Sequence, residues 1–122
     1  MMTTLIRKRA QMPRAPLTNC HEGRGELDWT VVLDGAEVPR GRVRFIHDDV
    51  MPPGASIGVH RHTDDEEHYF IVSGAGEMTL DGRRLSVGPG DLTVVYPGGE
   101  HGLENTGSEP LRLLVISVQA TP

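Results

Sequence analysis

Four residues of this chain combine the side chains and the spacing of a divalent metal site. One residue separates His60 from His62, Glu67 follows after four more, and a further histidine stands at His101. Imidazole nitrogens together with a carboxylate suit Fe, Mn, Ni, Co and Zn ions, and the general order of affinities does not select among these metals. The sequence therefore predicts one divalent metal ion held by His60, His62, Glu67 and His101.

The expected strand positions explain how these side chains could converge. Residues two apart in a strand share a face, so His60 and His62 project to the same side. If the next strand begins at Glu67, then Glu67 and Tyr69 point inward beside the histidines. Glu66 is the alternative ligand, because a β-bulge could exchange it with Glu67.

Other ligand-capable side chains are interpreted without a role at the metal. Asp64, Asp65 and Glu66 are expected to form a solvated turn. The segment Cys20-His21-Glu22 is interpreted as a rim or interface segment, because one short cluster without a partner set is a weak signal.

Three residues are candidates for catalysis beside the metal. Tyr69 shares the predicted inward face with Glu67. His47 could act as a general base near neutral pH. Arg44, or its neighbour Arg42, could bind a substrate carboxylate through two hydrogen bonds, although a solvent-facing arginine is the simpler interpretation.

Short strands must position these residues. Gly (15) and Pro (9) are together enriched, and no segment sustains a helical period. The pair Asp81-Gly82 indicates a two-residue hairpin turn, which requires positive φ. Many short strands at this spacing predict an all-β sandwich or barrel. Strands are expected at residues 27–33, 41–48, 55–61, 67–73, 76–80, 83–87, 91–96, 102–105 and 111–118.

The chain is expected to consist of an N-terminal arm, residues 1–26, and a β-barrel domain, residues 27–122. The arm is the least patterned part, because Pro13 and Pro16 interrupt regular structure. It is expected either to pack along the domain or to reach a partner subunit, and we expect a homodimer.

Composition argues against several classes of function. The net charge of −5 argues against sequence-independent binding to the phosphate backbone of nucleic acid. The basic residues near the start, Arg7, Lys8, Arg9 and Arg14, are interpreted as a solvated terminus. No apolar run approaches the ~18 residues of a membrane span. A single cysteine, Cys20, cannot form an internal disulfide and fits a cytoplasmic location.

Two motifs of the sequence resemble those of the cupins. The segment from Gly54 to Gly74 carries His60, His62 and Glu67 in the register of the first cupin motif. The segment from Gly90 to Asn105 carries Pro97-Gly98 and His101 in the register of the second. The one departure is Tyr96, where the family usually has proline. The resemblance covers residues 41–118.

This resemblance implies a single double-stranded β-helix, or jelly-roll, barrel. It carries the metal ligands over to the same four residues and makes Asn105 a structural residue. The glycines Gly54, Gly74, Gly90 and Gly98 are expected to be turn residues with positive φ or a close backbone approach.

A divalent ion with three neutral imidazoles and one carboxylate has a net charge of +1 and keeps positions open for a guest. We expect a metal-dependent enzyme acting on a small oxygenated or anionic substrate, of the dioxygenase or decarboxylase type. A metal-dependent isomerase or epimerase, and a non-catalytic small-molecule binding module, are the alternatives, because the fold does not decide among them.

Overall fold

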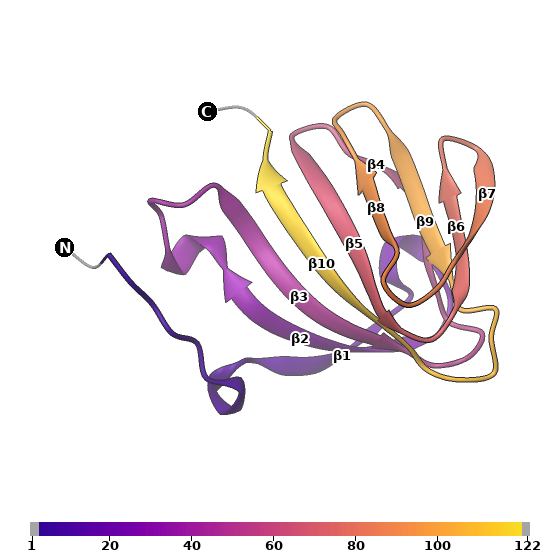
Figure 1. Cartoon of the computed structure of the whole chain (residues 1–122), viewed down its shortest axis with the longest axis horizontal. Helices are drawn as coiled ribbons and strands as arrows, with labels where there is room; N and C mark the ends of the chain where they lie inside the picture. Colours follow the sequence, from indigo (N-terminus) through magenta and orange to yellow (C-terminus); the bar gives the residue numbers. More distant parts are fainter. Residues whose placement is uncertain (1–2, 121–122) are drawn as a thin grey trace.

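Two antiparallel β-sheets face each other in the computed structural model, which describes residues 3–120 (Figure 1). The larger sheet has the order β1-β2-β3-β10-β5-β8, and the smaller has the order β4-β9-β6-β7. The strands are β1 (Arg14–Thr18), β2 (Glu26–Asp34), β3 (Val43–Met51), β4 (Ser56–Arg61), β5 (Asp65–Ser73), β6 (Gly76–Leu80), β7 (Arg83–Val87), β8 (Leu92–Val95), β9 (Glu100–Glu104) and β10 (Leu111–Gln119). Three short 3-10 helices accompany them: η1 (Arg9–Gln11), η2 (Cys20–Glu22) and η3 (Gly35–Glu37). The predicted all-β jelly roll is confirmed.

The core lies between the two sheets because alternate residues of each strand point inward. Along β10, Leu111, Leu113 and Val115 are buried, whereas the intervening Arg112 is exposed. Leu27, Ile71 and Met78 complete a core with no exposed surface at these positions. Burying each such side chain contributes about 1.5–3 kcal/mol relative to exposure, so this period-2 pattern fixes which face of every strand turns inward.

All nine expected strands are present, and the structure adds β1, which the sequence did not indicate. Pro16 interrupts the β1 sequence, and proline has no N–H to donate to a ladder. Such a residue is tolerated on an edge strand, and β1 forms the edge of the larger sheet, with Leu17 opposite Leu27 of β2. The predicted hairpin is confirmed, since Asp81 and Gly82 have φ of 47° and 82°.

The N-terminal arm lies along the chain's own domain, which was one of its two expected arrangements. Two of its basic residues form ion pairs: Arg7 pairs with Glu37 at 2.8 Å, and Arg9 pairs with Asp48 at 2.8 Å. Arg9 is still 60 % exposed in its side chain, as expected for a solvated terminus, whereas the Arg7 side chain is 21 % exposed and more enclosed than predicted. The division of the chain after residue 26 and the docking of the arm on another subunit stay predictions.

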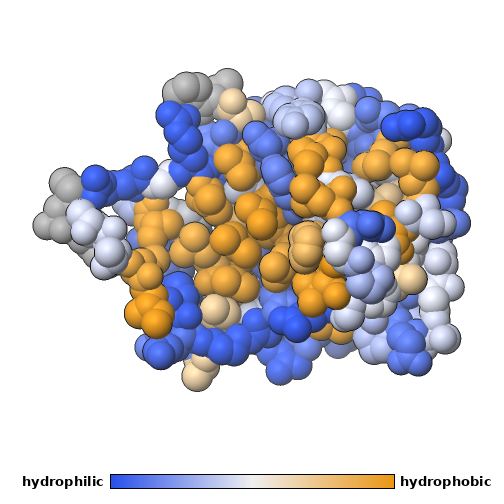
Figure 2. Space-filling view, in the orientation of Figure 1, coloured by the Kyte–Doolittle hydropathy of each residue, from blue (hydrophilic) through white to orange (hydrophobic). Residues whose placement is uncertain are grey.

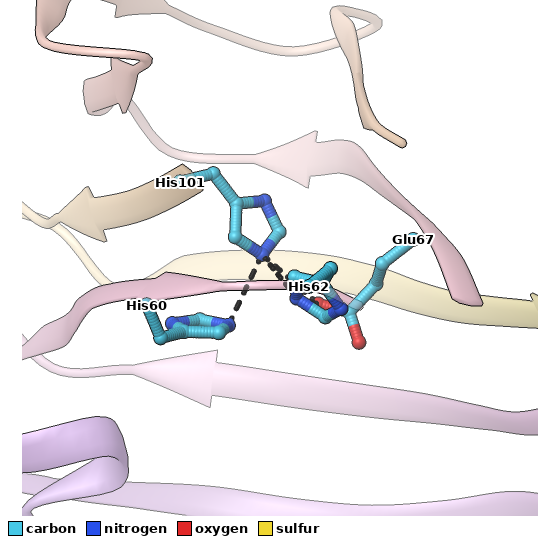
Figure 3. A group of neighbouring side chains, drawn as sticks. All are labelled: His60, His62, Glu67 and His101. Carbon is cyan, nitrogen blue, oxygen red and sulfur yellow. Dashed lines mark hydrogen bonds and ion pairs between the residues drawn. The ribbon is translucent and has the colours of Figure 1, made fainter. Parts of the chain in front are cut away.

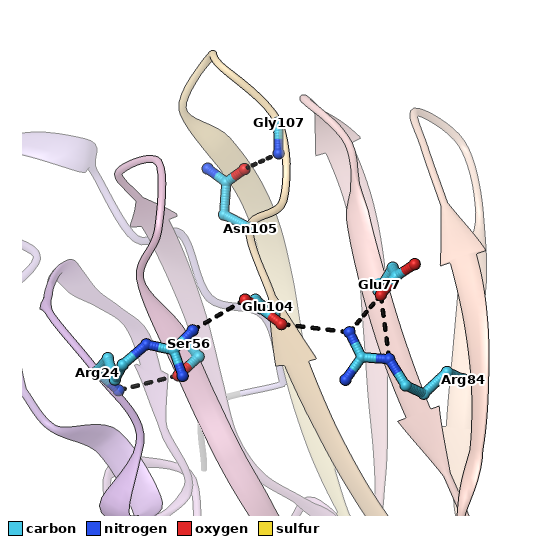
Figure 4. Close-up of polar contacts among 7 residues, drawn as sticks. All are labelled: Arg24, Ser56, Glu77, Arg84, Glu104, Asn105 and Gly107. Carbon is cyan, nitrogen blue, oxygen red and sulfur yellow. Dashed lines mark hydrogen bonds and ion pairs between the residues drawn. The ribbon is translucent and has the colours of Figure 1, made fainter.

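The turn residues of the two motifs have the predicted backbone. Gly54, Gly74, Gly90 and Gly98 all have positive φ, between 83° and 94°. Asn105 is 2 % exposed and holds the loop after β9. Its side-chain nitrogen donates to the carbonyls of Met51 and Glu109, both at 2.9 Å, and its oxygen accepts from the Gly107 N–H at 3.0 Å (Figure 4). Its predicted structural role is confirmed.

The outer face of the larger sheet carries an apolar patch beside charged residues such as Asp48 and Arg112. Figure 2 shows hydrophobic side chains gathered where β3, β10 and β5 run in Figure 1. Outward-pointing residues of the sheet include Ile46, Phe70, Leu92, Leu114 and Ile116, of which Phe70 is 38 % and Leu92 is 55 % exposed. In the part of the chain that the structure describes, no helix has the length and apolar character needed to cross a bilayer.

Candidate metal centre

The four predicted ligands meet in one cluster between the sheets. His60 lies on β4, His62 follows the end of that strand, Glu67 lies on β5 and His101 lies on β9. One ligand atom from each of the four residues lies within 4.8 Å of all the others. His101 is central: its Nε2 is 3.0 Å from Nε2 of His62, 3.2 Å from Nε2 of His60 and 3.1 Å from Oε1 of Glu67 (Figure 3).

Strand register brings these residues together. His60 and His101 are direct partners in the β4–β9 ladder, after a register shift that follows Ile57. The His62 N–H donates to the Gly99 carbonyl at 3.0 Å, which extends the contact past the end of β4. Glu67 comes from the opposite sheet and is 5 % exposed. The cluster therefore joins the two sheets.

The arrangement fits a divalent metal ion. Ligand atoms at about 2.1 Å from one ion, at right angles to each other, lie about 3 Å apart, which matches the spacing around His101. When the outer Nδ1 atom of an imidazole carries the ring's proton, the inner Nε2 atom presents a lone pair. Lone pairs about 3 Å apart would repel each other. A bound cation removes that repulsion and satisfies the buried Glu67 carboxylate.

Hydrogen bonds on the outer nitrogens orient two of the rings. Nδ1 of His60 donates to the Gly58 carbonyl at 2.7 Å, and Nδ1 of His62 bonds to Oδ1 of Asp65 at 2.8 Å. Because a carbonyl oxygen only accepts, Nδ1 of His60 carries the proton and Nε2 presents its lone pair. Nδ1 of His101 is buried and meets no partner among residues 3–120.

The pKa of His60 supports the same protonation state. Burial is the largest influence on its ring, and it lowers the pKa to about 4, further than the hydrogen bond to Gly58 raises it. The neighbouring imidazoles lower the pKa as well. His60 is therefore neutral at pH 7, which is the form that binds metal ions.

The prediction that Asp65 lies in a solvated turn is wrong. It is 6 % exposed, and its second carboxylate oxygen accepts from the Ser117 hydroxyl at 2.5 Å. Arg44 approaches the same oxygen at 3.7 Å. A buried carboxylate with these partners holds His62, so Asp65 is part of the site. Glu66, the alternative to Glu67, points to the outer face and pairs with His68 at 2.8 Å.

The three candidate catalytic residues have different surroundings. Tyr69 is 2 % exposed and packs on His101 with 4.4 Å between ring centroids. Burial, followed by the charge of Glu67, raises its pKa well above the ordinary value. His47 lies against Trp29 and Phe45, and burial lowers its pKa. The structure brings only Tyr69 against the four ligands.

The two arginine candidates lie outside the cluster. Arg44 is exposed and approaches Asp65 at 3.7 Å, and Arg42 is exposed just before β3. Neither guanidinium is part of the cluster.

Two further residues near the cluster had been given no role at the metal: Asp49 was not singled out, and His21 was placed in a rim or interface segment. Asp49 is 4 % exposed, and its Oδ1 has no hydrogen-bond partner. Burial, followed by the charges of Asp48, Glu67 and Asp28, raises its pKa to about 7. The expected strand ended at residue 48, one residue too early to place Asp49 inward beside His47. The second residue, His21, stacks on His60.

Comparison with known proteins identifies a sequence family and relatives that this chain resembles. Residues 47–117 match the sequence family described as the cupin domain. The "Oxalate-binding protein" of Thermotoga maritima is 27 % identical over 116 residues, which are 95 % of each chain.

Solved structures with a similar fold agree with the sequence comparison. A crystal structure from Thermotoga maritima, described as a predicted oxalate decarboxylase, is 25 % identical and has a TM-score of 0.87. The match covers 94 % of this chain and 99 % of that one. A Cupin 2 conserved barrel domain protein from Salinispora arenicola is 23 % identical and has a TM-score of 0.68, with 98 % of this chain covering 91 % of that one. The last likeness concerns the fold alone.

Proposed function

This chain belongs to the cupin family, and we propose that it binds a small dicarboxylate of the oxalate class at a divalent metal ion. His60, His62, Glu67 and His101 would hold the ion. The observation that carries the proposal is the convergence of three imidazole Nε2 atoms and one carboxylate oxygen within 4.8 Å.

Charge and the open positions of the ion favour this ligand class. Three neutral imidazoles and one carboxylate leave a divalent ion with a net charge of +1, so an anion is the preferred guest. Four protein ligands leave two positions of an octahedral ion free, which suits two oxygens of one molecule. The Thermotoga maritima relative is named for binding oxalate, the smallest dicarboxylate.

Isothermal titration calorimetry tests the binding proposal. Protein loaded with Mn(II) is titrated with oxalate, and with acetate as a matched anion that has a single carboxylate. We expect one oxalate per chain, with acetate at least tenfold weaker, and no binding to the chelator-treated protein. Equal binding of oxalate with and without metal would contradict the proposal.

Decarboxylation is the second candidate function, and buried Asp49 favours it. A hydrogen oxalate anion can yield carbon dioxide and formate: the C–C bond breaks, and a proton replaces the lost group on the remaining carbon. No external oxidant is consumed. Asp49, with a pKa of about 7, is a carboxyl group that can hold a proton inside the barrel at neutral pH.

Product analysis distinguishes catalysis from binding. Formate appearing in equal amount to oxalate consumed, without net oxygen uptake, would support a decarboxylase. Oxygen uptake coupled to substrate loss would support the dioxygenase type instead. Bound oxalate that stays intact would support a binding module.

We also propose that the chain forms a homodimer through the outer face of the larger sheet. Contiguous exposed apolar surface of this kind is typical of interfaces, and a two-fold axis lets one face serve both copies. Light scattering should give twice the chain mass of 13.3 kDa. Ile116→Lys at the centre of the face should give the mass of one chain, and an unchanged mass would contradict this face.

A further inference from the structure

The imidazole of His21 lies flat on the imidazole of His60. The ring centroids are 3.5 Å apart, and the planes differ by 11°. His21 comes from η2, outside residues 47–117 that match the family. Among residues 3–120, the stack on His60 is the ring contact that the His21 side chain makes.

The backbone that presents His21 adopts an unusual conformation. Asn19, His21 and Glu22 have φ of 50°, 49° and 64°, in the left-handed region that side chains other than glycine rarely adopt. Such a backbone is strained, and the conformation persists only where the surroundings enforce it. Three of them within four residues indicate that the segment is held in place by its contacts.

Gly58 links this segment to the metal centre. A Cβ atom at Gly58 would overlap the carbonyl oxygen of His21, and would also meet the backbone of Gly23 at 3.1 Å. The Gly58 carbonyl accepts the proton of Nδ1 of His60 at 2.7 Å. One glycine therefore seats the His21 backbone on one side and orients the His60 ring on the other.

The far end of the segment is fixed to the smaller sheet. The Arg24 N–H donates to the Ser56 hydroxyl at 2.9 Å, and the Ser56 N–H donates to the Arg24 carbonyl at 2.8 Å. The Arg24 guanidinium bonds to Glu104 at 2.9 Å, and Glu104 also pairs with Arg84 (Figure 4). These contacts bind residues 19–25 to β4 and β9, the strands that carry His60 and His101.

We propose that residues 19–25 form a positioning element for the metal centre, in which the ring of His21 holds the ring of His60 in its metal-binding orientation. The proposal rests on the metal site of the proposed function, but not on its dicarboxylate. His60 is half-buried at the edge of the cluster, and one hydrogen bond alone leaves its ring able to tilt. A flat contact restricts that tilt, so less rotational freedom is lost when the ion binds.

Cobalt(II) titration of three variants tests this role, with the visible absorption bands of the bound ion as the readout. His21→Asn tolerates the left-handed backbone but has no ring, whereas His21→Phe keeps a flat ring without nitrogen. We expect His21→Asn to bind Co(II) about threefold to tenfold more weakly, as expected when one side chain loses its restraint. His21→Phe should restore the affinity, and the saturated spectra should match that of the wild type. Arg83→Asn, at an exposed position of β7 that carries none of the four ligands, is the control and should bind as the wild type does.

Each other outcome has a defined meaning. Equal affinity of His21→Asn and wild type would overturn the positioning role while leaving the metal site intact. A weak His21→Phe would show that a His21 nitrogen acts directly, which also overturns it. Wild-type protein that fails to bind one Co(II) per chain would overturn the metal site and this proposal together. Thermal unfolding of the metal-free variants, expected to match the wild type, separates a local effect from misfolding.

Discussion

The Asp65 carboxylate bonds to Nδ1 of His62 at 2.8 Å from a position that is only 6 % exposed. The residue stands at the start of β5, two positions before Glu67, so one strand supplies both a proposed ligand and the group that orients another. Partners of this kind hold a metal-binding ring in place and raise its basicity.

Replacing Asp65 with alanine should weaken metal binding without removing a ligand. We expect a loss of about tenfold to a hundredfold in affinity for Mn(II) or Co(II), the range typical of such partners. Asp64→Ala, one residue earlier and exposed, is the matched control and should bind as the wild type does. Metal titrations in which the two variants agree would show that Asp65 has no part in the site.

Two glycine substitutions should separate close packing from general effects of side-chain addition. Gly58→Ala places a methyl group against the His21 carbonyl, and we expect it to reduce the free energy of unfolding by about 1–3 kcal/mol and to weaken metal binding. Gly88→Ala meets no atom within 4 Å and should change stability by less than about 1 kcal/mol. Urea unfolding of the metal-free proteins measures both. A stable Gly58→Ala protein would contradict the described contact.

The buried Asp49 carboxyl should make stability depend on pH. Its folded pKa of about 7 exceeds its ordinary value of 3.8, so the folded state keeps a proton that the unfolded chain releases between these pH values. Stability from this group is therefore present at low pH and is lost as pH rises through about 7. Asparagine does not titrate. The free energy of unfolding of Asp49→Asn, relative to that of the wild type, should therefore rise by on the order of a few kcal/mol between pH 4 and pH 8.

Chemical unfolding of metal-free protein at both pH values provides the comparison. A constant difference between Asp49→Asn and the wild type would contradict the buried, protonated carboxyl.

Much of the fold was predictable because inward and outward residues alternate so regularly. The turn glycines and the pair Asp81-Gly82 mark where strands end, and His60, His62, Glu67 and His101 come from two motifs with fixed spacing. β1 was not predictable in this way, since its partner β2 supplies the ladder that Arg14–Thr18 alone does not indicate.

The surroundings of the site were less accessible to sequence reasoning. Asp65 stands in an acidic run that is typical of a solvated turn, and only the tertiary contact with Ser117 shows that it is buried. His21 lies 39 positions before His60, and its ring contact depends on a left-handed backbone that no local pattern indicates. Ligands follow from motif spacing, whereas the groups that orient them follow from packing.

Elemental analysis of metal content tests the central claim most directly. Wild-type protein, loaded with Mn(II) and dialysed, is compared with His101→Ala, which removes the nitrogen that lies about 3 Å from three other ligand atoms. We predict one ion per chain in the wild type and less than about a tenth of that in the variant, with both proteins folded by circular dichroism. Equal metal content in the two proteins would contradict the assignment of this cluster as the metal centre.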